Sequence, residues 1–503
     1  MAVVAALVSV LVPTVHATRA TPPEPDPGHV GTWSAVQSWP LIAIHAVLTG
    51  DGKVLTYGSS ATGQQTGLFI YDVWTPGSSA AAGHETLPNT TGTDLFCNVQ
   101  VVDPNTDRVL MFGGDLWDAS AATNQGNPDI VTFDPRDATL SHLPGMLRPR
   151  FYASAVTLLN GDIYVQGGKD GADRAELWHK GESRLLPFDT SGLHFWYPRL
   201  FALPDGRVFG IDGKGEMFTI DESLTTLTRL GAAPPSLANW WWTSAEFTPG
   251  LILAFGGLTD ESFIIDTTTD PPTVRPSGDL SSTRIWATAT ILPDGRVLAT
   301  GGSAAGNKLI GVNNTAEIWD PATGEWQPSG DAALARLYHS TALLLPDGRV
   351  LVAGGGAPGP LNNTNAEIYS PEYLTNDDGS PAVRPVITAV SATRLSPGAD
   401  VFVDVESSVP LDRVTLVKTG SVTHSVNFDQ RFVELPLEHL GNLVRTRLPA
   451  AGVLTPGNYL LQVIDADGVP SVAKIIHIAP AASPTLEALV PSATMTAIRL
   501  GTP

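Results

Sequence analysis

Along most of the chain, apolar residues alternate with small or polar ones in short runs, and the runs come in pairs. Each pair encloses a turn, in most copies of the Asp-Gly or Asn-Gly type, and is followed by Gly-Gly or a remnant of it. Such alternation indicates strands, and these turns favour tight hairpins because glycine accepts positive φ. Seven copies span His45–Ser59, Asn98–Gly114, Ala153–Gly168, Arg199–Gly213, Thr243–Gly257, Ala287–Gly302 and His339–Gly356.

The copies recur every roughly 44 to 55 residues, the period of kelch-type propeller blades. Strand-like segments such as Ala316–Trp319 and Ala366–Tyr369 follow some copies and suit outer strands of the same blades. Two stacked sandwiches would not explain the regular Gly-Gly punctuation. We therefore predict an all-β fold whose first domain, residues 28–383, is a seven-bladed kelch-type β-propeller around an axial channel.

The spacing changes after Leu374. About seven short strand-like segments then fit into about a hundred residues, the pattern of an immunoglobulin-like β-sandwich. The segments are Pro385–Ala392, Asp400–Glu406, Arg413–Lys418, Phe432–Glu438, Val444–Ala450, Asn458–Ser471 and Ala473–Ala479. We assign this C-terminal sandwich to residues 384–480 and expect an irregular tail over 481–503.

The composition argues against nucleic acid and anionic membranes as binding partners. Hydrophobic residues make up 43% of the 503 positions, and the formal charge is −21. A chain this acidic lacks the clustered Lys and Arg that nucleic acid or an anionic membrane surface demands. The apolar run Ala2–Val12 is too short to span a bilayer. With the small residues that follow it, this run predicts a signal peptide over residues 1–20 and a secreted or cell-envelope protein without a membrane span. We expect a disordered segment over Thr21–Pro27.

Cys97 is the only cysteine of the chain. Exported proteins normally pair their cysteines, so a lone one is either an idle buried thiol or a reactive group. Free cysteine is among the most buried residue types, which by itself favours the idle thiol. Three further segments alter that balance by adding two phenols and two imidazoles: Arg150-Phe151-Tyr152, Arg336-Leu337-Tyr338-His339 and Thr423-His424-Ser425-Val426-Asn427.

These residues occupy matching places in the repeats. Cys97, Tyr152 and Tyr338-His339 each lie just before the first strand of a hairpin unit. Equivalent positions of different blades are related by rotation about the propeller axis, so such side chains can converge at one end of the channel. His45 shares this register, and we interpret it as structural. His424 falls in the sandwich, so its loop has to reach towards the axis, a sign of function.

Two imidazoles and two phenolate oxygens form a nitrogen and oxygen ligand set suited to tetragonal Cu(II). Zinc is less natural, since its sites favour Cys and His over Tyr. The expected metal ligands are therefore Tyr152, Tyr338, His339 and His424.

The chain resembles the radical copper oxidases, the family of galactose oxidase and glyoxal oxidase, from about residue 30 to 480. The motifs that carry the resemblance are Phe96-Cys97, Arg150-Phe151-Tyr152, Tyr338-His339-Ser340, Thr423–Arg431 and, in the sandwich, Leu454–Tyr459 with Asp467–Ser471. Each of the first four holds the residue on which the family's chemistry depends.

The resemblance implies a cofactor made partly by the chain itself. Cys97 would form a thioether with a ring carbon of Tyr152, and sulfur conjugation would ease formation of a tyrosyl radical there. Tyr152, His339 and His424 would be equatorial copper ligands, and Tyr338 the axial ligand and catalytic base. The implied reaction oxidises a primary alcohol or an aldehyde hydrate and reduces O2 to hydrogen peroxide.

The chain also departs from the family's galactose-oxidising members. Those members have an additional N-terminal carbohydrate-binding domain, whereas here we expect the leader to run almost directly into the propeller. Lys169-Asp170 follow Gly168 where those members have a tryptophan. Trp196 or one of Trp240-Trp241-Trp242 are the candidates to stack on the thioether instead. Tyr197-Pro198 is closer to the glyoxal oxidases. These departures put galactose in doubt as the substrate.

Two readings of the function follow. The favoured one is a monomeric, exported copper oxidase whose partners are O2 and a small alcohol, aldehyde or glycan. The alternative is a non-catalytic secreted kelch propeller that binds glycan or protein, which would have no reason to keep Cys97, Tyr152, Tyr338, His339 and His424 together. An oxidase with a dissociable organic cofactor is disfavoured because no G-x-G-x-x-G follows a strand and opens a helix.

Overall fold

The computed structural model describes residues 30–77, 82–116, 124–441 and 443–481. The predicted signal peptide, the segment Thr21–Pro27 and the tail beyond residue 481 lie outside these residues. The fold is all-β, and only two short 3₁₀ turns occur in the described chain, Pro235–Leu237 and Glu372–Leu374. Within the same residues, no helix is long and apolar enough to cross a bilayer.

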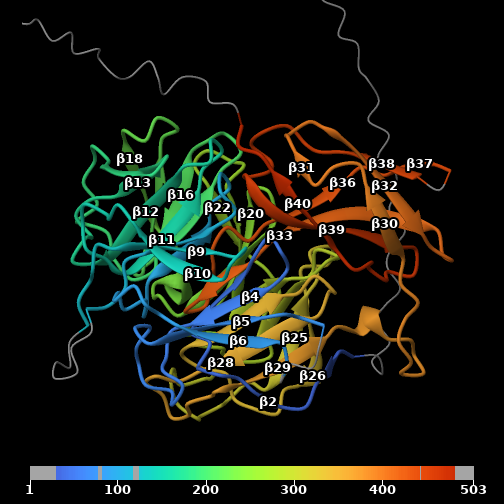
Figure 1. The fold of residues 1–503 in the computed structure, drawn as a ribbon, viewed down its shortest axis with the longest axis horizontal. Helices are drawn as coiled ribbons and strands as arrows, with labels where there is room; N and C mark the ends of the chain where they lie inside the picture. Colours follow the sequence, from blue (N-terminus) through green and yellow to red (C-terminus); the bar gives the residue numbers. More distant parts are fainter. Residues whose placement is uncertain (1–29, 78–81, 117–123, 442, 482–503) are drawn as a thin grey trace, which may run out of the picture.

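Four-stranded antiparallel sheets form the propeller, which confirms the predicted fold class (Figure 1). We number the blades in chain order, and seven are seen among the described residues. Blade 1 holds β3 (His45–Leu48), β4 (Val54–Tyr57), β5 (Ile70–Trp74) and β6 (His84–Pro88); blade 2 holds β7 (Val99–Val102), β8 (Val109–Phe112), β9 (Ile130–Asp134) and β10 (Thr139–Leu143); blade 3 holds β11 (Phe151–Thr157), β12 (Ile163–Lys169), β13 (Glu176–His179) and β14 (Glu182–Leu185).

The remaining blades follow the same plan. Blade 4 holds β15 (Arg199–Ala202), β16 (Val208–Ile211), β17 (Glu216–Ile220) and β18 (Leu227–Ala232); blade 5 holds β19 (Trp242–Thr248), β20 (Leu251–Gly256), β21 (Ser262–Asp266) and β22 (Thr273–Pro276); blade 6 holds β23 (Thr288–Ile291), β24 (Val297–Thr300), β25 (Thr315–Trp319) and β26 (Trp326–Asp331); blade 7 holds β27 (Ser340–Leu344), β28 (Val350–Gly354) and β29 (Asn365–Ser370). The hairpin units of the sequence supply the two inner strands of each blade.

Blade 7 is completed by the N-terminal part of the chain. Strands β1 (Thr32–Trp33) and β2 (Gln37–Ser38) both pair antiparallel with β29, with Thr32 opposite Ser370. The first and last blades are thereby joined, and the ring is closed without a free sheet edge at this point. The periodicity of the sequence did not predict this closure.

The C-terminal sandwich has two sheets, whose strands run from orange to red in Figure 1. One sheet has the order β30 (Val386–Val390), β32 (Asp400–Glu406), β38 (Leu443–Arg447) and β37 (Glu438–Leu440). The other has the order β31 (Arg394–Leu395), β40 (Lys474–Ile478), β39 (Gly457–Asp465), β33 (Leu411–Lys418) and β36 (Phe432–Leu435). Buried aliphatic residues of both sheets form a core of their own.

The sandwich covers the propeller end that carries the Asp-Gly turns. Arg413 Nη1 donates to Asp294 O over 3.2 Å, and Arg384 Nη1 donates to Asp347 O over 2.7 Å. Both acceptors immediately precede a turn glycine. The opposite end of the ring, where the first strand of each blade begins, is left free for the predicted site.

A hairpin from the sandwich enters the axial channel. Its strands β34 (Ser421–Thr423) and β35 (Val426–Asn427) extend the sheet of blade 1, with Thr423 opposite His45. Three residues that follow the hairpin are hydrogen-bonded to blades 3, 5 and 6. Asp429 accepts from Thr157, and Gln430 Oε1 accepts from Ile291 N over 2.9 Å. Arg431 donates to Glu246 over 2.9 Å. This anchoring places His424, at the tip of the hairpin, on the axis, as expected from its motif.

Candidate metal centre

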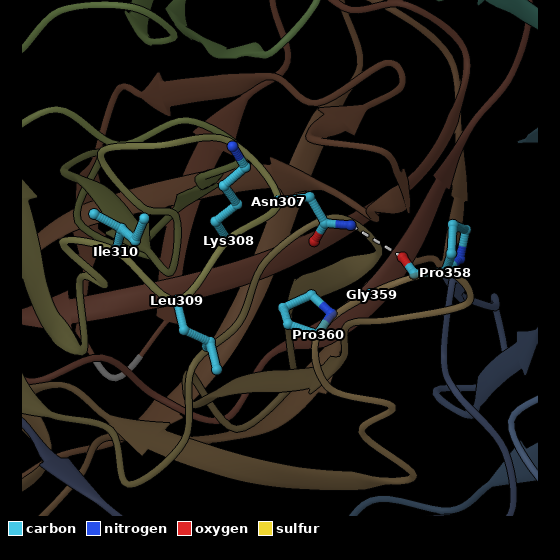
Figure 2. Close-up of a pocket in the computed structure, with 7 residues that line it drawn as sticks. All are labelled: Asn307, Lys308, Leu309, Ile310, Pro358, Gly359 and Pro360. Atoms are coloured by element: carbon cyan, nitrogen blue, oxygen red, sulfur yellow. Dashed lines mark hydrogen bonds between the residues drawn. The ribbon is translucent and has the colours of Figure 1, made fainter.

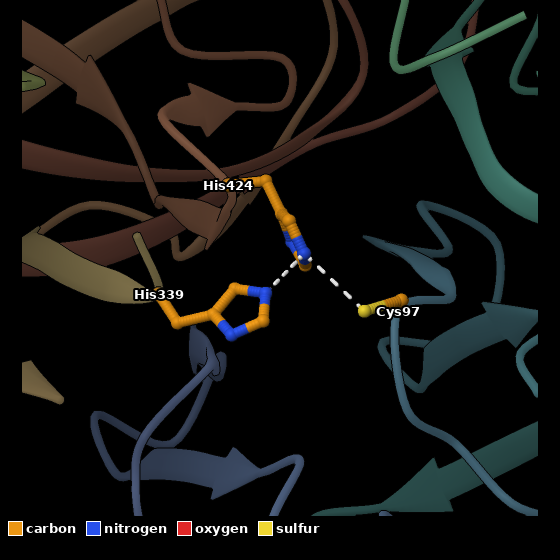
Figure 3. Close-up of side chains that lie close together, drawn as sticks. All are labelled: Cys97, His339 and His424. Carbon is orange, nitrogen blue, oxygen red and sulfur yellow. Dashed lines mark hydrogen bonds between the residues drawn. The ribbon is translucent and has the colours of Figure 1, made fainter. Parts of the chain in front are cut away.

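Three of the predicted site residues converge from different parts of the chain (Figure 3). Cys97 precedes the inner strand of blade 2, His339 precedes that of blade 7, and His424 comes from the axial hairpin. His424 Nε2 lies 2.7 Å from His339 Nε2 and 3.3 Å from Cys97 Sγ. All three side chains are buried, and their donor atoms lie within 4.8 Å of one another. This spacing fits one metal ion.

Hydrogen bonds to the far ring nitrogens determine the tautomers of the two histidines. His339 Nδ1 lies 2.6 Å from Gly356 O, an acceptor that only an N–H can satisfy. His424 Nδ1 lies 2.6 Å from Thr423 Oγ1, whose hydroxyl already donates to Ile44 O over 2.9 Å. Both Nδ1 atoms are therefore donors, and both Nε2 atoms carry lone pairs. Two lone pairs facing each other repel unless a cation lies between them, which is the arrangement of paired metal ligands.

The charge state of the imidazoles agrees with this assignment. Burial lowers the pKa of His339 to about 3. Burial, followed by the neighbouring His339, lowers the pKa of His424 well below its usual value. Both rings are thus neutral at physiological pH and able to bind a metal without first losing a proton.

Two phenols lie beside the imidazoles. The hydroxyls of Tyr152 and Tyr338 are hydrogen-bonded to each other. The Tyr338 ring stacks on that of His339 at 3.6 Å between centroids, and the Tyr152 ring lies 5.2 Å from that of His424. Burial raises the pKa of both tyrosines well above its usual value, so a cation is needed to make either one a phenolate near neutral pH.

The exposure of the side chains to solvent differs among these five residues. Both tyrosines retain partial exposure to solvent, whereas Cys97, His339 and His424 are buried. The tyrosine side is therefore the side from which a small molecule can approach.

Cys97 and Tyr152 are neighbours in adjacent blades. Tyr152 N donates to Cys97 O over 3.1 Å, and the thiol hydrogen-bonds with the Tyr152 side chain. Burial raises the pKa of the Cys97 thiol well above its usual value, and the hydrogen bond to Tyr152 opposes the rise. The thiol is thus neutral and held beside the phenol.

Residues around the site adopt left-handed backbone conformations that side chains rarely take. The φ values are 57° at Cys97, 70° at Tyr152 and at Trp286, 39° at Tyr197 and 49° at His424. Such residues cost about 1 to 3 kcal/mol each and persist only where the surroundings enforce them. Hydrogen bonds between blades provide that enforcement, since Tyr197 N donates to Tyr152 O over 2.9 Å and Trp286 N to Trp241 O over 3.2 Å.

Buried arginines in ion pairs hold the backbone just before three of the aromatic residues at the site. Arg150, two residues before Tyr152, pairs with Glu176 at 2.9 Å and donates to Gly167 O at 2.6 Å. The pairs Arg284–Glu317 and Arg336–Glu367 repeat this arrangement ahead of Trp286 and Tyr338. All of these side chains are buried. The spacing Arg-x-aromatic therefore marks the site in three blades, and it could have revealed Trp286, which the sequence analysis missed.

Tryptophans form the wall beside the phenols. The Trp240 ring lies 5.7 Å from that of Tyr152 and 4.6 Å from those of Trp196 and Trp286. Trp286 in turn lies 4.7 Å from Tyr338. Neither Trp196 nor Trp240 is parallel to Tyr152, with interplanar angles of 66° and 48°. Of the candidates proposed to cover the thioether, these two are close to Tyr152, in tilted rather than stacked positions.

Arg199 holds the tryptophans of this wall in place, whereas Lys169 and Asp170 lie away from it. Arg199 lies over the ring of Trp242, 4.9 Å from its centroid, and donates to Trp240 O over 3.1 Å and to Tyr197 O over 2.6 Å. Lys169 and Asp170 instead tie the loop of blade 2, through Asn124 O and Gly126 N. Lys169 and Asp170 thus connect two loops by hydrogen bonds and do not contribute to the wall.

A surface pocket of about 540 Å³ lies at the same end of the propeller, between the β24–β25 and β28–β29 loops (Figure 2). Asn307 donates to Pro358 O across it over 3.0 Å, and Leu309 and Ile310 line it. None of its lining residues belongs to the predicted site. It is linked to the centre through the segment that also provides Gly356 O to His339, and through Ser303, which is hydrogen-bonded to Ile285 beside Trp286.

Comparisons with known proteins agree with the motifs. The model of the galactose oxidase-like early set domain matches residues 384–478. Galactose oxidase of Gibberella zeae is 28% identical over 516 aligned residues, which cover 90% of this chain and 71% of that protein. The aldehyde oxidase GLOX of Vitis pseudoreticulata is 28% identical over 66% of this chain and 72% of its own length.

The chain is similar to the radical copper oxidases over most of its length. These oxidase relatives identify the chain as a copper radical oxidase enzyme, which sets aside the alternative of a non-catalytic propeller. A solved fungal alcohol oxidase of the AA5 family, in complex with copper, has the same fold, with a TM-score of 0.80 at 24% identity over 90% of this chain and all of that one. The resemblance stated from the motifs is thus confirmed.

Proposed function

We propose that the chain is an exported oxidase that converts a primary alcohol or an aldehyde hydrate to the next oxidation level and reduces O2 to hydrogen peroxide. The observation that carries the proposal is the pair of imidazoles whose Nε2 lone pairs face each other at 2.7 Å beside two hydrogen-bonded phenols. This donor set fits Cu(II), which favours imidazole nitrogen with oxygen ligands.

We assign the copper ligands to Tyr152, Tyr338, His339 and His424. Gly356 O and the Thr423 hydroxyl fix the orientation of the two imidazoles. When bound, copper supplies a one-electron acceptor and acidifies a hydroxyl that reaches it.

The two tyrosines have separate roles in this proposal. Tyr338 accepts the hydroxyl proton of the substrate, and Tyr152, as a radical, takes the hydrogen atom from the substrate carbon. Their direct hydrogen bond and their partial exposure bring both phenol oxygens to the side that a substrate reaches. The tilted Trp196 and Trp240 rings lie against Tyr152 on the same side and offer an apolar wall to the substrate.

Cys97 completes the cofactor through a thioether to a ring carbon of Tyr152. In this step the S–H bond and one ring C–H bond break and a C–S bond forms. The two electrons and two protons released reduce O2 to hydrogen peroxide. The support is that the two residues are joined through backbone and side-chain hydrogen bonds and that Cys97 has no cysteine with which to form a disulfide.

Loading the protein with Cu(II) in air tests this assignment. The intact mass should fall by about two hydrogens in the wild type and stay unchanged in Cys97→Ser. A Cys97 that remains alkylatable in denatured protein after copper and air would refute the thioether. Peroxide release measured with primary alcohols, aldehydes and glycans then identifies the substrate class.

Tyr338→Phe tests the proton acceptor. The variant should keep copper and the thioether yet lose turnover by on the order of 10²–10⁴-fold, the usual effect of a lost acid–base group. Turnover near the wild-type level with copper bound would remove Tyr338 from the mechanism.

The proposal of export rests on the apolar run Ala2–Val12 and the small residues that follow it. Expression of the full chain in a secreting host should yield mature protein in the medium whose N-terminus lies near residue 20. Recovery of uncleaved protein inside the cells would contradict this part of the proposal.

A further inference from the structure

His45 is a buried histidine beside the centre that has no part in the function proposed above. It lies at the start of β3, and its Nε2 accepts a hydrogen bond from Cys97 N over 3.2 Å. Its Nδ1 lies 2.9 Å from Gln100 Oε1, and its ring stacks on that of Tyr57 at 4.5 Å. The imidazole is therefore held on both nitrogens and on one face.

The tautomer of His45 is set by a chain of hydrogen bonds that begins in the axial hairpin. Gln100 Nε2 donates to Val422 O over 3.1 Å, which leaves Gln100 Oε1 to face His45. An amide oxygen can only accept, so His45 Nδ1 is a donor and Nε2 carries the lone pair. That lone pair is the acceptor which the Cys97 amide requires.

Cys97 depends on this acceptor because its backbone is in a strained conformation. Its φ is 57°, and its carbonyl accepts from Tyr152 N over 3.1 Å. The hydrogen bond to the Cys97 carbonyl fixes the C-terminal side of the residue relative to Tyr152, and the hydrogen bond from the Cys97 amide to His45 fixes its N-terminal side. Removal of the His45 acceptor leaves a buried amide without a partner and allows Cys97 to relax.

We propose that His45 is a positioning residue for cofactor formation: by holding the Cys97 amide it keeps the thiol aimed at the Tyr152 ring. The inference rests on the thioether of the proposed function, with O2 as the acceptor of the two electrons and two protons released. Val422 lies two residues before His424, so the hairpin that brings the second histidine also orients His45. Placement of the thiol and placement of a metal ligand are thus coupled through one element.

The test compares variants that differ in their ability to accept from Cys97. The amide oxygen of His45→Gln reaches the place of Nε2, whereas His45→Asn ends near the place of Nδ1, and His45→Leu has no acceptor. After addition of Cu(II) in air, the rate of the two-hydrogen mass loss should fall on the order of 10-fold in the Asn and Leu variants, the effect of one lost buried hydrogen bond. The Gln variant should stay within about 3-fold of the wild type by the same reasoning.

Two further measurements separate positioning from general damage. Thermal unfolding of the metal-free variants reports overall stability, and Tyr57→Phe, which keeps the stacked ring, serves as a folded control. Hydrogen exchange of the Cys97 amide, resolved by mass spectrometry, reports the His45 bond itself and should accelerate in the Asn and Leu variants.

The outcomes are distinct. Equal mass-loss rates and unchanged exchange at Cys97 in His45→Asn overturn the inference even where His45→Leu does not fold. If the wild type forms no thioether, the proposed cofactor fails. The positioning role is then decided by exchange alone, with faster exchange in Asn than in Gln supporting it and equal exchange refuting it.

Discussion

The end of the propeller that faces the sandwich and the end that holds the metal centre both require left-handed backbone, but only the metal end obtains much of it from residues with side chains, beside the glycines of its Gly-Gly pairs. At the sandwich end, the inner hairpins of all blades except the second turn on glycines with φ between 82° and 89°. At the metal end, Cys97, Tyr152, Tyr197 and Trp286 adopt positive φ with their side chains in place. Glycine avoids the backbone strain at the sandwich end, whereas the metal end accepts that strain at these four residues.

This difference separates what folding needs from what chemistry needs. A tight turn requires only that the backbone adopt positive φ, so glycine, which has no side chain, is the most suitable residue. The centre needs a thiol, phenols and rings at set positions, and the buried Arg–Glu pairs and hydrogen bonds between blades compensate the strain there. Substitutions at the metal end should therefore affect function first, and those at the sandwich end only stability.

His424→Ala should have the largest effect. The variant loses one of two facing Nε2 ligands, so the native Cu(II) spectrum and turnover should both fall to background. Copper stoichiometry and electron paramagnetic resonance measure this. The matched control is His477→Ala, which removes a buried histidine of the same domain bound to Asp107 and Asn458. Loss of copper in that control as well would mean that both changes act through the domain fold.

Among the substitutions in the residues that hold the metal end in place, Glu176→Gln should lower the free energy of unfolding most. It leaves the buried Arg150 without its anion, and breaking such a pair costs about 3 to 5 kcal/mol. Denaturant unfolding should show that loss, together with slower thioether formation because Tyr152 is less well held. The control Glu438→Gln breaks an exposed pair with Arg445 in the sandwich and should cost at most about 1 kcal/mol. Equal losses in both would contradict a special role for the buried pairs.

Asp94 makes the stability of the metal end depend on pH. Burial raises its pKa to about 6, although Phe96 N, Gly67 N and the Thr66 hydroxyl donate to it. A raised folded-state pKa means that the folded protein binds the proton more tightly, so the stabilisation is present at low pH and is lost between about pH 4 and 6. In Asp94→Asn, the difference in unfolding free energy between pH 4 and 7 should shrink by about 2 kcal/mol. An unchanged pH profile would assign that dependence to other groups.

Gly348→Ala should have the smallest effect. The turn glycine has φ of 84°, and the nearest atom to an added Cβ is 3.6 Å away, so only backbone strain opposes the change. We expect a loss of about 1 to 2 kcal/mol in unfolding free energy with turnover unchanged. Gly348→Asn should lose less, because asparagine tolerates the left-handed region. A fall in turnover would show that the two ends are not independent.

Much of this architecture was readable because strand alternation and turn glycines are local signals. The hairpin units appear in the structure as the inner strands, and Cys97, Tyr152, Tyr338, His339 and His424 come together. Closure of blade 7 by Thr32–Trp33 was not readable, since two residues show no alternation and their partner is distant in sequence. Trp286 was missed for another reason: its arginine spacing was present, but tryptophan is not a metal ligand and drew no attention.

The closure of the ring has a consequence for the order of events during synthesis. Strand β1 leaves the ribosome first, yet it cannot pair until β29 has been made. His424 follows later still, on a hairpin that must settle among inner strands already in position. The metal centre is therefore completed only after all blades have been made, and a nascent chain that ends before residue 424 lacks one of its histidines.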